Sequence, residues 1–318
     1  MVYPRYWKKF PELSKKELFQ PGAIMASDGY RLNTYAAGDA PKDTIVFVNP
    51  PTIPFLLMSS LAAALSAEFR VLSWETRGAP FLDEIHENVS LSLDRHARDL
   101  TDIVSVAGPQ QVHYVGWCGG SWIISVAVLK TGAPATSISL IAPNNVDGGQ
   151  NQTDYQSRAE AIIKRFIDAN ADEVETIHKV IQAGTQKGVC GTQTQNILRR
   201  VAELNLETPQ CALQWARTIN EFGIVRRAAD DQLWGGAATS LFDRLCDQVP
   251  VLILHCRDDD IVGHRCSLLA SERNPGSKLI LYPVGGHCVP YVNPSMLSAD
   301  IASFVRQTGR LASGRTAA

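Results

Sequence analysis

The amino-acid sequence predicts an α/β protein whose central sheet is mostly parallel, with helices on both faces and a helical insertion. Short runs of β-branched and aromatic residues alternate with helical periods at the spacing of strand–helix units. Most of these runs are apolar throughout, which is typical of strands buried on both faces of a parallel sheet. The alternation stops near residue 147, residues 148–240 hold helical periods alone, and strand runs then return.

The first part of the chain begins with an antiparallel hairpin, because residues 29–35 alternate apolar and polar side chains after the turn signal Ser27-Asp28-Gly29. Four buried strands are then expected at 44–48, 69–74, 111–115 and 137–141. Helices are expected between them, at 56–67, 93–106 and 121–130.

Strands are expected again at residues 249–255 and 278–282, and a helix over 298–307 completes the fold. We divide the chain into a first core part, a helical cap insertion and a second core part, over 1–147, 148–245 and 246–318. Gly148 to Asn151 is the expected hinge into the cap. A small, polar tail from Gly309 onward is expected to fray.

Composition and charge exclude several classes of protein. The chain has 318 residues, of which 45% are hydrophobic and 19% charged, so it holds ample material for a packed core and is not intrinsically disordered. A formal net charge of −2 gives no support for nucleic-acid binding, which favours a basic excess. No apolar run approaches the roughly 18–20 residues of a membrane span, and residues 1–22 hold no apolar segment of a secretory signal.

The cysteines indicate a reducing compartment. There are 7 of them, an odd number, and no pair has the close spacing of a zinc or redox site. We therefore expect no disulfide framework and no metal centre. We also expect no bound cofactor. The predicted location is the cytoplasm.

The strongest local signal for chemistry is Gly116-Trp117-Cys118-Gly119-Gly120, which comes where a buried strand turns into a helix. This is the position and spacing of a nucleophile elbow, in which small neighbours allow a sharp turn that lifts the nucleophile out of the sheet. The helix N-terminus that follows favours the Cys118 thiolate and directs the Gly119 N–H toward a reacting carbonyl. The alternative is a glycine-rich turn with a buried, inert cysteine.

An acid and a histidine follow in the order that such an elbow needs. Three successive aspartates, Asp258, Asp259 and Asp260, come after a buried strand, at the sheet edge where ligands bind in α/β folds. Asp259 fits the offset from the strand end best, with Asp258 and Asp260 as alternatives. His287 follows the last strand after two glycines, and we predict that it is the catalytic base. Each of the other histidines, His255 among them, lacks this combination of position, order and flanking residues.

An oxyanion hole needs a second backbone N–H, which in such folds follows the first central strand. That place reads Asn49-Pro50-Pro51-Thr52-Ile53. Because proline has no N–H, the donor is expected to be Thr52 or Ile53, unless the Asn49 side-chain amide contributes. A rigid turn between strand and helix is the alternative role of the two prolines.

Two residues near these motifs have weaker support for a role in the active site. Arg77 follows a strand on the same edge of the sheet, and an ion pair with an acid is favoured over substrate contact. Cys288 is adjacent to His287, but no mechanism requires it. Nothing in the sequence resembles a P-loop, a dinucleotide-binding fingerprint or a zinc ligand cluster.

Together these motifs resemble the α/β-hydrolase superfamily across about residues 20–310. The resemblance implies Cys118 as nucleophile, Asp259 as acid and His287 as base, with the helical insertion as the variable cap of that fold. The cysteine nucleophile is similar to that of two acyltransferase groups. One comprises the polyhydroxyalkanoate synthases, whose box reads G-x-C-x-G-G. The other comprises stand-alone aminoacyltransferases of nonribosomal peptide pathways, such as those serving syringomycin and coronamic acid assembly, and the chain length suits this group better.

The resemblance implies an acyl or aminoacyl transferase that moves its acyl group between the phosphopantetheine thiols of carrier proteins in natural-product biosynthesis, through an acyl-S-Cys118 intermediate. Exchange between two thioesters is close to isoenergetic, which favours transfer. The alternative is a thioesterase or an ester or lactone hydrolase with the same triad, because the dienelactone hydrolases are cysteine hydrolases of this fold. A catalytically silent receptor or scaffold is disfavoured, since all three triad residues are present.

Overall fold

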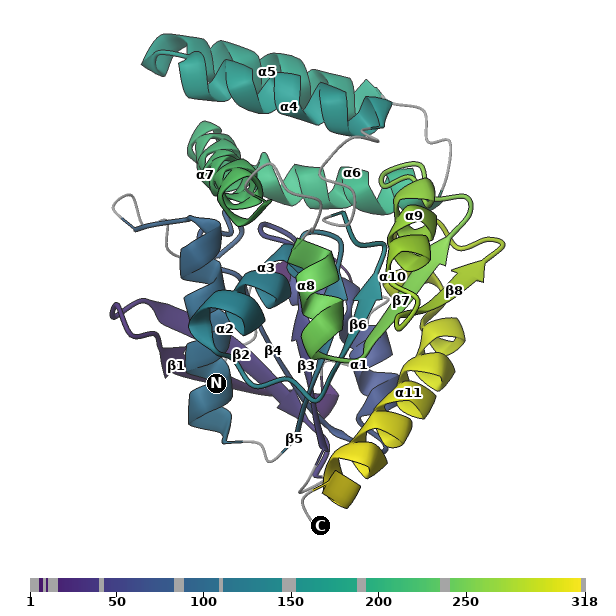
Figure 1. The fold of residues 1–318 in the computed structure, drawn as a ribbon. Coiled ribbons are helices and arrows are strands. Elements are labelled where there is room, and N and C mark those ends of the chain that lie inside the picture. The colour runs from purple at the N-terminus through teal and green to yellow at the C-terminus, as the bar shows by residue number, and fades with distance from the viewer. Residues whose placement is uncertain are drawn as a thin grey trace.

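The structure is a computed structural model of the chain, and it describes residues 6–7, 10, 17–39, 43–82, 89–108, 111–144, 153–187, 193–234 and 241–315. Figure 1 shows a central sheet with helices on both sides and a further group of helices above it. The expected hinge at Gly148 to Asn151 lies outside the described residues.

Eight strands form one sheet in the order β1-β2-β4-β3-β5-β6-β7-β8. β1 and β2 make the expected antiparallel hairpin, β2 is also antiparallel to β4, and all other neighbours are parallel. None of the residues in β3 to β7 is exposed, as expected for strands covered on both faces. The strands are β1 (Gln20–Met25), β2 (Arg31–Ala37), β3 (Asp43–Val48), β4 (Arg70–Trp74), β5 (Gln111–Trp117), β6 (Ser137–Ile141), β7 (Val251–Cys256) and β8 (Lys278–Tyr282).

Helices cover both faces of the sheet, and each layer closes over its own apolar cluster. The side chains of β3 show this division, because Ile45 and Phe47 belong to one cluster while Val46 and Val48 belong to the other. The first cluster is covered by α1 (Ser59–Leu65), α10 (Val289–Val292) and α11 (Pro294–Arg315). The second is covered by α2 (Leu93–Ala107), α3 (Gly120–Val126), α8 (Leu241–Gln248) and α9 (Arg265–Arg273).

Four further helices lie between β6 and β7 in the chain: α4 (Asp154–Asp168), α5 (Ala171–Lys187), α6 (Gln193–Asn205) and α7 (Pro209–Trp234). In Figure 1, α4 and α5 run side by side at the top, with α6 and α7 between them and the sheet. A capping box of Thr153 and Gln156 starts α4. A third apolar cluster, which includes Phe166, Val174 and Ala212, joins α4, α5 and α7. We refer to these four helices as the cap helices.

Two helices in the first half of the chain differ from their predicted extents. The stretch predicted as one helix over 56–67 is a 3-10 turn, η3 (Phe55–Leu57), followed by α1. The helix predicted over 121–130 is α3 followed by a π-helical turn, η4 (Ala127–Thr131). This turn ends at Gly132, whose φ of 71° stops the helix.

The C-terminal helix is longer than predicted. It begins at Pro294 rather than residue 298 and continues to Arg315, so the expectation that the chain frays from Gly309 onward is wrong as far as Arg315. Thr308 and Gly309 are buried, and a Cβ at Gly309 would lie 3.1 Å from the side chain of Gln111 at the start of β5. This close approach holds the end of α11 against the sheet.

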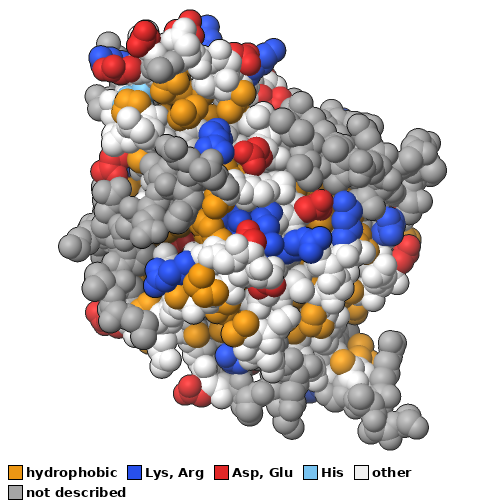
Figure 2. All heavy atoms as spheres, turned by 90° about the vertical axis from the view of Figure 1, so that its left-hand side faces the viewer, with side chains coloured by type: hydrophobic (Ala, Val, Ile, Leu, Met, Phe, Trp, Pro, Cys, Tyr) orange, Lys and Arg blue, Asp and Glu red, His pale blue; other side chains and the backbone are white. Residues whose placement is uncertain are grey.

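The surface carries charges of both signs. On the face in Figure 2, Lys and Arg side chains form a band across the middle, with acidic and apolar side chains beside them. Within the described part of the chain, no helix combines the length and the apolar composition that a membrane crossing needs.

Candidate active site

Cys118 stands at the sharp turn between β5 and α3. Its φ angle is 48°, a left-handed conformation that is strained for a residue other than glycine and that a nucleophile elbow imposes. The turn depends on small neighbours, because a Cβ at Gly120 would lie 2.0 Å from the carbonyl oxygen of Val48. A Cβ at Gly116 would lie 2.5 Å from Ile124. The glycines on both sides of Cys118 thus permit the close contact of α3 with the sheet.

His287 and Asp259 form a buried pair. Nδ1 of His287 lies 2.9 Å from Oδ2 of Asp259. The other carboxylate oxygen, Oδ1, accepts the backbone N–H groups of Ile261 and Val262, each at 2.9 Å. An ionised carboxylate can only accept, so the proton of this contact is on Nδ1. Cys118 and His287 line the same cavity, and Nε2 is the imidazole nitrogen that Asp259 leaves free to face the thiol.

Asp258 and Asp260, the alternative acids, bind other partners. Asp258 accepts the backbone N–H groups of Gly285 and Gly286, at 3.2 and 2.9 Å, and so fixes the loop that carries the histidine. Asp260 accepts the side-chain amide of Gln195 in α6 at 3.1 Å. Of the three neighbours, only Asp259 reaches His287 in the described structure.

The charges in this group stabilise one another. Burial raises the pKa of Asp259, but the adjacent His287 and the hydrogen bonds to the carboxylate outweigh it and hold the pKa well below its ordinary value. Burial lowers the pKa of His287, but the charges of Asp259 and Cys118 outweigh it and raise the pKa to about 10. A protonated His287 beside an ionised Asp259 is therefore favoured at neutral pH.

Gly119 and Thr52 line the same cavity as Cys118. In the described part of the chain, neither residue donates its N–H to another group, so both are available to a developing oxyanion. Ile53 donates its N–H to the Pro50 carbonyl at 3.2 Å, and Asn49 is not among the residues that line the cavity. This arrangement favours the Thr52 N–H as the second oxyanion donor, over the Ile53 N–H and the Asn49 side-chain amide.

The loop that carries Thr52 is held by two residues that the motifs did not include. The Thr52 φ angle is 65°, and its carbonyl accepts the side-chain amide of Asn205, the last residue of α6, at 3.2 Å. The Glu75 carboxylate accepts the Phe55 N–H at 3.1 Å and the hydroxyl of Tyr6. Burial raises the pKa of Glu75 to about 7, although these hydrogen bonds oppose the shift.

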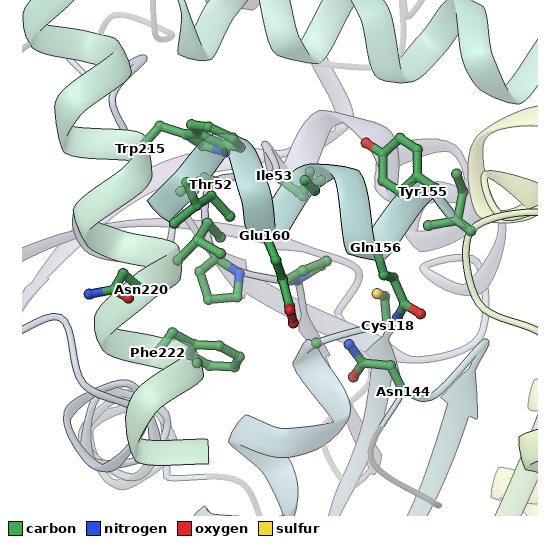
Figure 3. Close-up of a pocket in the computed structure, with 18 of the residues that line it drawn as sticks. Thr52, Ile53, Cys118, Asn144, Tyr155, Gln156, Glu160, Trp215, Asn220 and Phe222 are labelled. Carbon is green, nitrogen blue, oxygen red and sulfur yellow. The ribbon is translucent and has the colours of Figure 1, made fainter. Parts of the chain in front are cut away.

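Cys118 opens into a cavity of about 730 Å³ between the sheet and the cap helices. Figure 3 shows side chains of α4 and α7 extending into this space. Apolar residues form much of its wall, with polar groups among them. The residues that line it include Asn144, Tyr155, Gln156, Glu160, Trp215, Phe222 and Cys266.

Trp117 belongs to the site, although no sequence motif assigns it a role there. Its indole N–H donates to the backbone carbonyl of His287 at 3.0 Å. Its ring packs against the imidazole, with centroids 5.4 Å apart. The only available signal was its place inside the elbow, directly before Cys118.

Arg77 and Cys288 do not line the cavity. Arg77 is buried and pairs with Asp99 at 2.6 Å and with Asp28 at 2.9 Å, so it forms the ion pair that was favoured over substrate contact. Cys288 is buried beside the histidine. Among the described residues, no group of His, Cys, Asp or Glu side chains is arranged to hold a metal ion.

Comparisons with known proteins support the fold. No family model matches the chain, and no curated protein matches it by sequence. Solved structures do match. An α/β-hydrolase fold protein from Burkholderia ambifaria has a TM-score of 0.64 at 16% identity, covering 88% of this chain and 96% of its own. An esterase from a Rhodococcus species has a TM-score of 0.63 at 16% identity, covering 91% of this chain and 98% of its own.

A bromoperoxidase from Bacillus anthracis is similar to the same extent, with a TM-score of 0.63 at 15% identity, covering 90% of this chain and 100% of its own. Likenesses at these identities show the fold and not the reaction, because this fold hosts many chemistries. The chain has the α/β-hydrolase fold, as its motifs predicted.

Proposed function

We propose that the protein is an acyltransferase that moves an acyl or aminoacyl group between pantetheine thiols through a thioester with Cys118. The observation that carries the proposal is the Cys118 side chain on a left-handed elbow beside the paired His287 and Asp259. These groups supply a nucleophile, a base and an acid that orients the base. The donor and acceptor thiols are phosphopantetheine arms of carrier proteins, and the enzyme itself holds no cofactor.

The first half-reaction forms the acyl-enzyme. The Cys118 thiolate attacks the carbonyl carbon of the donor thioester, and the N–H groups of Gly119 and Thr52 stabilise the resulting oxyanion. The carbon–sulfur bond to the donor pantetheine then breaks. The leaving sulfur takes the proton from Nε2 of His287, which becomes neutral while its Nδ1–H stays on Asp259.

The second half-reaction passes the acyl group on. The acceptor thiol gives its proton to His287 and attacks the acyl-Cys118 carbonyl through the same oxyanion. The bond to Cys118 breaks, and the thiolate is restored beside the imidazolium. Each half-reaction exchanges one thioester for another, so the acyl group stays activated.

The cap helices support transfer over hydrolysis. α4 and α7 cover the cavity with side chains such as Trp215 and Phe222, which limit the water that reaches the acyl-enzyme (Figure 3).

A hydrolase with the same triad is the second candidate. Asn144, Gln156 and Glu160 point into the part of the cavity where Cys118 lies, and such polar groups can hold an attacking water.

The test uses alanyl and octanoyl thioesters of pantetheine and records the intact-protein mass. We expect an acyl adduct on the wild-type protein that hydroxylamine removes, and no adduct on Cys118→Ala. Cys266→Ala is the matched control, because Cys266 lines the same cavity but is not on the elbow. This control is expected to form the adduct at the wild-type rate.

The fate of the adduct separates the two candidates. With N-acetylcysteamine as acceptor, the proposal predicts acyl-N-acetylcysteamine and little free acid. Free acid formed at one rate with and without the acceptor identifies a hydrolase. If neither thioester gives an adduct and a thiol-reactive probe labels Cys118 only after unfolding, both candidates fail.

A further inference from the structure

We propose that His255 is a positioning residue for the triad, which fixes the Asp259 carboxylate and limits how strongly that carboxylate holds the proton of His287. The inference rests on the proposed function, because it assigns His255 to the same catalytic group. His255 is in β7, four residues before the acid, and is fully buried. It does not touch substrate, since it is not among the residues that line the cavity.

His255 approaches the same carboxylate oxygen of Asp259 as His287 does. Its Nε2 lies 3.3 Å from Oδ2 of Asp259 and 2.9 Å from the Val262 carbonyl oxygen. Its Nδ1 lies 2.8 Å from the hydroxyl of Ser267 in α9. Both ring nitrogens are therefore engaged, and the ring connects the acid to a helix that packs on the sheet.

The partners of His255 determine where its proton lies. A carboxylate and a carbonyl can only accept hydrogen bonds, so Nε2 must carry a hydrogen. The Ser267 hydroxyl can donate to Nδ1, which makes a neutral ring with its hydrogen on Nε2 fully satisfied. The opposite tautomer would aim the Nε2 lone pair at two acceptors.

Two imidazole rings thus share one carboxylate oxygen. Oδ2 of Asp259 accepts from His287 at 2.9 Å and lies 3.3 Å from Nε2 of His255, whose hydrogen also faces the Val262 carbonyl, while Oδ1 accepts two backbone N–H groups. A second donor on Oδ2 stabilises its negative charge and so weakens its attraction for the His287 proton. This matters because His287 must release a proton in each catalytic cycle.

Other titratable groups face this network from several elements. Among the described residues, His255 hydrogen-bonds Val262 and Ser267, and Asp259 is the one charged group within ion-pair distance of its ring, so removing the ring changes one charged contact. The other titratable groups near the triad are Cys118 on the elbow, Asp258 and Asp260 in the loop after β7 (the acid loop), Tyr155 on α4, Cys256 on β7 and Cys288 beside His287.

The test measures the alkylation rate of Cys118 by iodoacetamide against pH, read on the Cys118 peptide. It needs no substrate. A thiolate–imidazolium pair gives two steps, one where the pair forms and a second at higher pH where His287 loses its proton. The variants are His255→Leu, which removes the donor, and His255→Gln, which keeps an N–H near the Nε2 position.

The matched control is His113→Leu. His113 is also a buried strand histidine, and its Nδ1 lies 2.7 Å from the Ser137 hydroxyl, but it contacts no triad residue in the described structure. We expect His255→Leu to move the second step upward by about half a pH unit or more. His255→Gln and His113→Leu should keep it at the wild-type position.

A second step that stays in place or moves to lower pH in His255→Leu would overturn the inference. If that variant does not fold, ¹⁵N spectra of the histidine rings in the wild-type protein decide instead. They should show the Nε2–H tautomer for His255, and a hydrogen on Nδ1 alone contradicts the role. A wild-type profile with a single step at an ordinary thiol pKa, about 8.5, defeats the proposed function itself.

Discussion

Three adjacent carboxylates in the loop after β7 bind three different kinds of partner. Asp259 contacts His287, Asp258 accepts backbone N–H groups of the histidine loop, and Asp260 accepts a side-chain amide of the cap. Their chemistry is identical, so backbone direction alone decides which of them meets the imidazole. Which of the three aspartates contacts His287 therefore depends on the orientation of each side chain and not on residue type.

Replacing Asp259 by Asn should slow acylation of Cys118 by about a thousandfold, because an amide can present a hydrogen to Nδ1 and leave the wrong tautomer of His287. The rate of adduct formation with the octanoyl thioester measures this effect. Asp260→Asn is the matched control and should stay within about threefold of wild type, since its partner is an exposed cap contact. Equal losses in the two variants would remove Asp259 from the triad.

Gly120→Ala should destabilise the protein by about 2–4 kcal/mol, because the new Cβ would lie 2.0 Å from the Val48 carbonyl oxygen. The new Cβ would meet backbone atoms of Val48, so the clash cannot be relieved by the rotation of a side chain. Urea unfolding followed by circular dichroism measures the change. Gly276→Ala, which meets no atom within 4 Å, should change stability by less than about 1 kcal/mol. A stable Gly120→Ala protein with normal acylation would contradict the tight packing of the elbow.

At the scale of elements, α6 connects the cap to two catalytic loops. Its first turns contact the acid loop through Gln195 and Asp260, and its last residue, Asn205, holds the carbonyl of Thr52. The helix therefore spans the distance between the Asp259 loop and the Thr52 loop. Under the proposed function, a cap in this position affects the geometry of the reaction as well as the shape of the cavity.

Asn205→Ala should slow acylation about tenfold, because the Thr52 N–H loses the contact that orients it toward the oxyanion. The alkylation rate of Cys118 by iodoacetamide should not change, since that reaction forms no oxyanion. Asn170→Ala, at the start of α5, is the control for loss of a cap asparagine and should leave both rates at wild type. Parallel loss of both rates in Asn205→Ala would show that the change disturbs the thiol rather than the oxyanion donor.

Most strands were predictable from the sequence, because buried strands of a parallel sheet leave continuous apolar runs such as those of β3 and β6. The elbow was predictable because its glycines are sequence neighbours of the nucleophile. The end of α11 was not, since the burial of Thr308 and Gly309 comes from contact with the distant β5. The partners of Trp117 and His255 were hidden for the same reason, as tertiary contacts leave no local pattern.

At the scale of the whole molecule, a buried acid connects segments that are far apart in the chain. Glu75, at the end of β4, hydrogen-bonds Tyr6 near the N-terminus and the backbone of Phe55 after the Thr52 loop. Burial raises its pKa from 4.5 to about 7, so the folded protein holds this proton more tightly than the unfolded chain does. The stabilising effect is complete below pH 4.5 and is lost as the pH rises through 7.

The stability difference between wild type and Glu75→Gln should therefore change with pH. Between pH 4.5 and 7 the wild type should lose up to about 1.4 kcal/mol per pH unit relative to the variant. His96 and His113 affect the pH dependence of stability in the opposite direction, because burial lowers their pKa values to about 3 and about 4. Both histidines are present in wild type and variant, so their contributions cancel in the stability difference. Urea unfolding at pH 5, 6, 7 and 8 provides the measurement.

Glu68→Gln is the control for this comparison. Glu68 is exposed in the turn between α1 and β4, where it pairs with Arg306, so its replacement should give a difference that is flat over the same range. A flat difference for Glu75→Gln as well would mean that the Glu75 carboxyl titrates like a solvent-exposed acid.

The cap has an apolar cluster of its own, separate from the two clusters on the sheet. Helices α4 and α5 contribute their buried apolar side chains to this third cluster alone, so these two helices can open as a cooperative unit while the sheet stays folded. We expect amide hydrogens of α4 and α5 to exchange at a lower free energy than those of β3 and β5. Under the proposed function, such sub-global opening is an entry route for the pantetheine arm. Because this cluster is separate, mutations in it can change the part of the cavity wall that α4 forms while Cys118, His287 and the strands that support them stay intact. Substrate specificity can then evolve independently of catalysis.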